Sequence, residues 1–198
     1  MARFGILGGT FNPPHVAHLV CASEAAHQLD LDRVVLMPVA RPPHKEIVAE
    51  PGPEERLALC RLATAGDARL AVSRLEIDRG GPSYTVDTLR ELHARAPEDD
   101  LTFIVGADMA LGLPTWHDPQ GVLGLARIAV AQRSGAARED IVARLAETSA
   151  ATDVAFFDMP RLDVSSSDVR RRVSEGRPIR YLVGGAVAER IERARLYR

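Results

Sequence analysis

Residues 8–19 read GGTFNPPHVAHL and follow directly on a short apolar run at residues 3–7, RFGIL. The apolar run predicts a buried strand. Apolar residues then recur at helical spacing, at Val16, Leu19, Val20 and Leu29, so a helix is expected over Val16–Leu29. The chain therefore opens with a strand, a glycine-rich turn and a helix.

The rest of the chain repeats this alternation. Further strands are expected at 34–39, 70–73, 101–105, 127–131 and 154–157, and further helices at 54–65, 83–94, 138–147, 166–174 and 186–194. Alternating strands and helices predict an α/β fold, a doubly wound (Rossmann-like) parallel sheet with helices on both faces. No repeat or linker divides the 198 residues, so we expect a single domain over 1–198, with a helical C-terminal part from about 160.

Composition favours a cytoplasmic globular enzyme. Hydrophobic residues make up 46% of the chain and charged residues 26%, and no window is long and apolar enough to span a membrane. The N-terminus, MARFGILGG, lacks the features of a secretory signal. Cys21 and Cys60 each lie in an apolar helical pattern, which favours two buried thiols in a reduced cytoplasm over a disulfide.

The charges are unevenly distributed. Residues 161–198 hold 10 Arg and 5 acidic residues, whereas residues 1–160 hold 15 basic and 22 acidic residues. The basic end lacks the interleaved aromatic residues that stack on bases, so no nucleic-acid partner is expected and a small polyanion such as a triphosphate suffices. Lys45 is the one Lys among 25 basic residues. Either this position needs an ammonium group that a guanidinium cannot replace, or Lys45 is present by chance in a sequence whose coding bias favours Arg.

Four segments with unusual residues follow expected strands. They are Gly8–His18, Pro42–Lys45, Gly106 with Asp108, and Ser165–Arg170. Ligands of doubly wound sheets bind outside the carboxyl ends of the strands. We therefore expect these four segments to meet at one edge of the sheet.

Gly8-Gly9-Thr10 lies between the first strand and the first helix. Glycines let backbone N–H groups approach a phosphate closely, and a helix N-terminus favours an anion. The segment matches neither G-x-G-x-x-G nor a P-loop, and as an isolated pair the glycines fit a plain tight turn equally well.

His15 and His18 are spaced i, i+3 and project from one side of the first helical turn. Two imidazoles there can donate hydrogen bonds to phosphoryl oxygens. The alternative is that one ring caps the helix or packs. A zinc site would need more ligands than the sequence offers nearby.

Ser165-Ser166-Ser167-Asp168 opens the helix expected at 166–174. Its hydroxyls and the free N–H groups of a helix start can form a second phosphate cradle, and Arg170 can bind phosphate with its fork. A plain capping box, with Ser165 as N-cap and Asp168 in third position, is the alternative. Arg171 and Arg172 are expected in solvent.

These segments carry a family resemblance. GGTFNPPHVAHL resembles the GGTFDPxHxGHL signature of the nucleotidylyltransferase superfamily, and VSSSDVR at 164–170 resembles its ISSTxIR signature. PPHK at 42–45, SYTVDTL at 83–89, FIVGAD at 103–108 and LPTWHDP at 113–119 narrow the resemblance. From Phe4 to about Tyr181 the chain is similar to the bacterial nicotinate-nucleotide adenylyltransferase family.

The resemblance implies adenylyl transfer from ATP to nicotinate mononucleotide, with Mg²⁺ carried by ATP and no metal ligand set of the protein's own. The catalytic residues would be His15, His18, Lys45 and Arg170. The ATP-binding residues would be Gly8, Gly9, Thr10, Phe11, Gly106, Asp108, Ser165, Ser166 and Ser167. Thr85 and Trp116 would line the nicotinate pocket, with the indole stacked on the pyridine ring. The sequence leaves room for a homo-oligomer.

Some alternatives stay open. Thr85 fits a plain helix cap, and Trp116 a half-buried core residue. Asn12, Ala17 and Ser167 depart from the signatures, where Asp, Gly and Thr are usual, and none of the three removes a phosphate ligand. Another member of the superfamily, such as a phosphopantetheine adenylyltransferase or a cytidylyltransferase, is the closest rival, followed by a non-catalytic nucleotide-binding domain.

Overall fold

A computed structural model describes residues 1–42, 51–132, 137–149 and 153–198. Within these ranges, six parallel strands form one sheet in the order β3-β2-β1-β4-β5-β6. The strands are β1 (Arg3–Gly9), β2 (Arg33–Pro38), β3 (Leu70–Val72), β4 (Asp100–Gly106), β5 (Arg127–Gln132) and β6 (Val154–Asp158). The strand order reverses direction between β1 and β4, which is the switch point of a doubly wound sheet. The predicted α/β fold class is confirmed.

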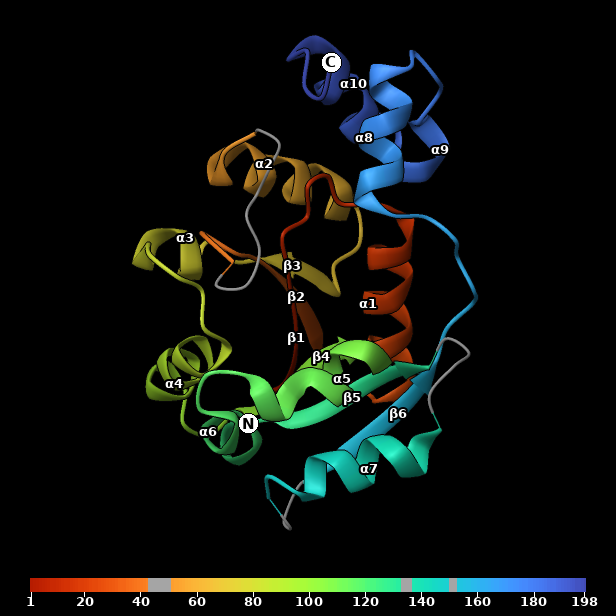
Figure 1. The fold of residues 1–198 in the computed structure, drawn as a ribbon. Coiled ribbons are helices and arrows are strands. Elements are labelled where there is room, and N and C mark those ends of the chain that lie inside the picture. The colour runs from red at the N-terminus through yellow and green to blue at the C-terminus, as the bar shows by residue number, and fades with distance from the viewer. Residues whose placement is uncertain (43–50, 133–136, 150–152) are drawn as a thin grey trace.

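Helices cover both faces of this sheet (Figure 1). They are α1 (Val16–Gln28), α2 (Pro53–Thr64), α3 (Leu75–Arg79), α4 (Thr85–Arg95), α5 (Ala107–Gly112), α6 (Pro119–Leu125), α7 (Arg138–Ala146), α8 (Ser166–Ser174), α9 (Arg180–Val183) and α10 (Gly185–Arg193), with a 3₁₀ turn, η1, at Leu113–Thr115. Helices α1 and α2 pack on one face, and α3 to α7 pack on the other.

The alternation of side chains along the strands produces these two layers. In β1, Ile6 belongs to the core cluster beneath α4 to α7, whereas Leu7 belongs to the cluster beneath α1 and α2. Successive strand residues point to opposite faces, so an apolar run such as RFGIL is buried on both sides.

The C-terminal helices form a third cluster beyond the carboxyl edge of the sheet. Val169 of α8, Val183 of α9 and Ile191 of α10 pack together with Leu59 of α2. Glu55 of α2 also accepts two hydrogen bonds from Arg190, at 2.6 and 2.7 Å, and this lowers the pKa of Glu55. The basic C-terminal part is thereby held above the carboxyl edge of the sheet, as Figure 1 shows.

Every strand and helix expected from the sequence is present, with its ends shifted by at most two residues. The short helices α3, α5, α6 and α9 were not predicted, because four to seven residues do not complete a helical pattern that periodicity can detect. Only α6 carried a local signal. Its N-cap Asp118 accepts from the Gly121 N–H at 3.0 Å, and Pro119 follows in first position.

The two arginines that follow Arg170 pair with an acidic residue of their own helix. Arg171 is exposed, as expected, with 64% of its side chain accessible, whereas Arg172 is half-buried at 27%; both pair with Asp168, one turn earlier on α8. The two guanidiniums lower the pKa of the Asp168 carboxyl, the hydrogen bond from Arg172 contributing most. The acidic third residue of the expected capping box is thus engaged by arginines of its own helix.

Cys21 and Cys60 are buried and form no disulfide, as predicted. Within the described ranges, none of the helices has the length and apolar character needed to cross a membrane.

Candidate active site

The turn after β1 is tightly packed. A Cβ on Gly9 would lie 3.0 Å from the ring of Phe11, so a larger residue would displace that ring. Phe11 itself has a left-handed backbone, with φ of 48°, and its side chain is buried in the core beneath α1. The ring of Phe11 meets the His18 ring edge-on at 5.0 Å. Phe11, predicted to bind ATP, thus contributes its side chain to the core.

His15 and His18 stand together at the start of α1. His15 is the N-cap residue, and the two rings stack with centroids 3.7 Å apart. The Nδ1 atom of His18 accepts a hydrogen bond from the His15 backbone N–H at 3.1 Å. A neutral His18 ring then carries its proton on Nε2, where it can be donated to an oxyanion. The capping role and the phosphate-binding role are therefore compatible in this residue.

The start of α8 abuts the loop that leads into α1. The Ser166 hydroxyl donates to the Pro13 carbonyl at 2.8 Å, and Arg170 donates to the Asn12 carbonyl at the same distance. Figure 1 shows α8 directly above the first turn of α1. Two helix N-termini, each with backbone N–H groups that have no intrahelical acceptor, are thus brought side by side.

The side chains of the SSSD segment are used within the fold. Ser165 is the N-cap of α8, and its hydroxyl accepts from the Asp168 N–H at 3.1 Å. The Ser167 hydroxyl accepts from Arg170 at 3.2 Å. Anion binding by this segment would therefore rest mainly on the backbone N–H groups of the first turn and on the charge of Arg170.

A cavity of about 380 Å³ lies between the ends of β1 and β2 and the start of α4. It is lined by Ile6, Gly8, Gly9, Thr10, Met37, Val39, Pro42, Glu76, Ser83, Tyr84, Thr85, Phe103, Met109, Trp116 and His117. The predicted phosphate loop and the predicted pyridine-binding residues Thr85 and Trp116 thus share one cavity. Trp116 is half-buried, since it lines the cavity and also packs edge-on against Phe103, with ring centroids 6.0 Å apart; its role in pyridine binding stays a prediction.

Thr85 is the first residue of α4 and is not its cap. The N-cap position belongs to Tyr84, and no side chain of the described residues caps this helix. The uncapped first turn therefore presents backbone N–H groups beside the cavity. Tyr84 and His117, whose rings are 4.4 Å apart, also line it, although they were not among the predicted site residues. They could have been predicted as cavity residues, because they are the sequence neighbours of Thr85 and Trp116 in the matched segments.

Glu76 contributes a buried carboxyl group to the cavity wall. It is 5% exposed, and its Oε1 accepts a hydrogen bond from the Thr88 hydroxyl at 2.6 Å. Desolvation raises the pKa of Glu76, and the hydrogen bond from Thr88 only partly offsets this. Arg79 donates to the same hydroxyl at 2.8 Å, so α3 is linked to α4 through Thr88.

Arg56 of α2 is a fully buried cation behind the predicted phosphate loop. Its guanidinium donates to the carbonyl of Thr10 at 2.8 Å and to those of Val39 and Ala40 at 2.7 and 3.2 Å. It joins the segments that follow β1 and β2 and places a positive charge behind the glycines. Arg56 was not predicted as a site residue, because the sequence alone does not distinguish a buried Arg of an amphipathic helix from an Arg on its exposed face.

The remaining predicted residues divide into two groups. Gly106 ends β4 and is the N-cap of α5, and the exposed Asp108 lies in the first turn of that helix, so both stand at the same carboxyl edge. Lys45 lies outside the described residues, and its role stays a prediction.

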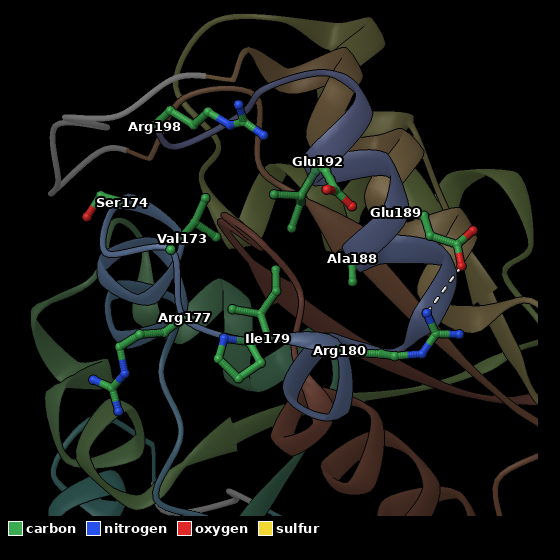
Figure 2. A pocket seen from close by; sticks show the side chains of 12 residues that line it. Val173, Ser174, Arg177, Ile179, Arg180, Ala188, Glu189, Glu192 and Arg198 are labelled. Atoms are coloured by element: carbon green, nitrogen blue, oxygen red, sulfur yellow. Dashed lines mark hydrogen bonds and ion pairs between the residues drawn. The ribbon is translucent and has the colours of Figure 1, made fainter.

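A larger cavity, of about 640 Å³, lies elsewhere, between α8, α9 and α10 (Figure 2). None of the predicted site residues lines it. Its Arg180, on α9, is paired with Glu189 of α10 at 3.3 Å, as the dashed line in Figure 2 marks. The predicted site residues therefore lie at the sheet edge and not in this larger cavity.

Comparisons with known proteins identify the family of this chain. A family model described as cytidylyltransferase-like matches residues 6–172. A probable nicotinate-nucleotide adenylyltransferase of Roseiflexus sp. is 46% identical, over 100% of this chain and 98% of the relative. One from Thermus thermophilus is 43% identical, over 99% and 100%.

A solved structure shows the same fold. Plasmodium falciparum nicotinic acid mononucleotide adenylyltransferase, complexed with NaAD, superposes with a TM-score of 0.80 at 15% identity, covering 100% of this chain and 98% of that one. The chain therefore belongs to the cytidylyltransferase-like family and, within it, to the nicotinate-nucleotide adenylyltransferases.

Proposed function

We propose that this chain transfers the adenylyl group of ATP to nicotinate mononucleotide, giving nicotinate adenine dinucleotide and pyrophosphate, a step in NAD biosynthesis. The observation that carries the proposal is the meeting of two helix N-termini, α1 and α8, beside a cavity lined by Thr85 and Trp116. The first feature suits a triphosphate, and the second suits a planar ring with an acidic substituent.

The reaction needs positioning and charge stabilisation rather than a strong base. An oxygen of the nicotinate mononucleotide phosphate forms a bond to the α-phosphorus of ATP, the bond between the α- and β-phosphates breaks, and pyrophosphate leaves. A phosphate monoester has a second pKa of about 6, so the nucleophile is already ionised near neutrality. The protein must bring two polyanions together and stabilise the charge that develops during transfer.

Different residues would carry out the positioning and the charge stabilisation. His18 would donate from Nε2 to a phosphoryl oxygen, because its Nδ1 is engaged by the His15 N–H. The first turns of α1 and α8 would hold the β- and γ-phosphates through their backbone N–H groups. Arg170 and the buried Arg56 would add positive charge on either side of the loop.

Mg²⁺ would arrive with the nucleotide. It prefers oxygen ligands, keeps several waters and is commonly held by substrate phosphates with one or two carboxylates. Within the described ranges, no group of three His, Cys, Asp or Glu residues could hold a metal alone, whereas Asp108 offers one exposed carboxylate at the edge. This donor set fits a metal bound mainly by the triphosphate, which would neutralise charge on the leaving pyrophosphate.

The pyridine end would lie in the cavity. The uncapped start of α4 favours an anion, so the nicotinate carboxylate would be bound near the Thr85 backbone N–H. The Trp116 indole would stack on the ring. A neutral carboxamide gains less from the helix terminus, which gives selectivity against the nicotinamide form.

Pyrophosphate release tests this assignment. Purified protein with ATP and Mg²⁺ should release pyrophosphate on addition of nicotinate mononucleotide, and much more slowly with nicotinamide mononucleotide. Equal rates with the two would refute the selectivity, and release only with phosphopantetheine would refute the function. Omission of the acceptor is the control for ATP hydrolysis.

A further inference from the structure

Tyr197, the penultimate residue, reaches the loop between β1 and α1. Its hydroxyl donates a hydrogen bond to Oδ1 of Asn12 at 2.6 Å. Asn12 is 4% exposed, so this contact is made inside the protein, at a distance of 185 residues along the chain. Tyr197 lies outside all of the matched segments.

The end of α10 directs Tyr197 to this position. The Leu196 N–H donates to the Ile191 carbonyl at 3.0 Å, and the Arg195 N–H donates to the Glu192 carbonyl at 3.1 Å. With Arg195 in the left-handed region at φ of 54°, these two bonds form a Schellman motif. The chain therefore reverses after α10, Leu196 packs on the cluster that contains Ile191, and Tyr197 turns inward.

Asn12 follows a strained residue. Phe11 has a left-handed backbone, which is unfavourable for a residue with a Cβ and persists only where the surroundings hold it. Arg56 holds the Thr10 carbonyl before it, and Arg170 holds the Asn12 carbonyl after it. From the C-terminal end, the Tyr197 hydroxyl holds the Asn12 side chain, and His15 begins the cap of α1 three residues later.

We propose that Tyr197 is a positioning residue for adenylyl transfer, which acts through Asn12 to fix the loop that sets the start of α1 and its two histidines. The proposal rests on the proposed function. It also gives a reason for Asn12, where related signatures carry Asp. The amide oxygen accepts the Tyr197 hydrogen bond without adding a negative charge beside the triphosphate.

The hydroxyl is suited to act as a permanent donor. Burial raises the pKa of Tyr197, and the nearby charges of Arg170 and Arg56 offset this only in part. The phenol therefore keeps its proton throughout the neutral range and donates in every catalytic cycle.

Tyr197→Phe removes the hydroxyl and keeps the ring. We expect kcat/KM for ATP to fall about 10-fold, the scale of leaving one buried acceptor unsatisfied, while KM for nicotinate mononucleotide changes less than about twofold. Tyr181→Phe is the matched control, because Tyr181 of α9 is 92% exposed, and its kinetics should equal those of the wild type. A Tyr197→Phe protein with a lower melting temperature but unchanged kcat/KM would make Tyr197 merely structural and overturn the proposal.

A double-mutant cycle tests the route through Asn12. If the two residues act through one bond, Asn12→Ala and Tyr197→Phe together should lower kcat/KM no more than Asn12→Ala alone, whereas additive losses would overturn the proposal. Should Tyr197→Phe fail to fold, Asn12→Ala with Tyr197 intact must show the same loss in kcat/KM for ATP, and wild-type kinetics would overturn it. A wild-type protein without activity would instead overturn the proposed function, because every kcat/KM value in the cycle is measured relative to that of the wild type.

Discussion

The two halves of the site are built in different ways. The phosphate half consists of backbone: two helix starts and a glycine turn, held in place by side chains such as Arg56 and Ser166 that bond to carbonyls. The proposed pyridine half adds side chains to the uncapped first turn of α4, with the rings of Tyr84 before α4 and Trp116 after η1 and a buried carboxyl from α3. We infer that changes in the phosphate half affect the rate of transfer, whereas changes in the pyridine half affect which acceptor binds.

His18→Ala should have the largest effect. Loss of one donor to the transferring phosphoryl group lowers kcat by about 10²-fold or more. Steady-state pyrophosphate release measures it. His27→Ala, at the exposed end of the same helix, is the matched control and should keep the wild-type rate. If His18→Ala kept a near-normal kcat, His18 would be only a capping and packing residue, and the division between the two halves would fail.

Trp116→Ala should act on the other half. Loss of the stacking surface is expected to raise KM for nicotinate mononucleotide about 10-fold and to leave KM for ATP nearly unchanged. Trp116→Phe, which keeps an aromatic ring, should recover most of the affinity. A rise in KM for ATP of the same size would show that the indole supports the whole site rather than the pyridine cavity.

Glu76→Gln should have the smallest effect, seen in stability. The pKa of Glu76 is raised in the folded protein, so the unfolded chain loses this proton more readily, and stability falls as pH rises from about 4.5 through the folded pKa. The Gln variant lacks this penalty and can still accept from Thr88. Its melting temperature at pH 8 should exceed that of the wild type by about 2–4 °C, with a smaller gap near pH 5. A lower melting temperature at both pH values would show that both carboxylate oxygens are needed as acceptors.

The long elements of the fold could be predicted because each has its own periodicity. The first strand and helix, 3–7 and 16–29, needed nothing beyond apolar spacing and a glycine turn. Short helices such as α5 were missed, because six residues at a strand end are fixed by packing rather than by pattern. Local sequence therefore specified the layers, and tertiary contacts specified the connections.

The site residues show the same difference between local sequence and tertiary contacts. His15, His18 and Ser165 were found because their roles at helix starts depend on neighbours in sequence, and the structure places each at a helix N-terminus. Arg56 and Tyr197 were missed, because each acts on a segment at least 16 residues away through a contact that no local pattern encodes.

The burial of Cys60 has a consequence for chemical damage. Desolvation raises the pKa of this thiol to about 12, and the side chain is fully enclosed between α2 and the sheet. The thiolate is the form that oxidants and alkylating agents attack, and almost none exists near neutrality in the folded protein. Cys60 is thus shielded from peroxide for as long as α2 stays packed against the sheet.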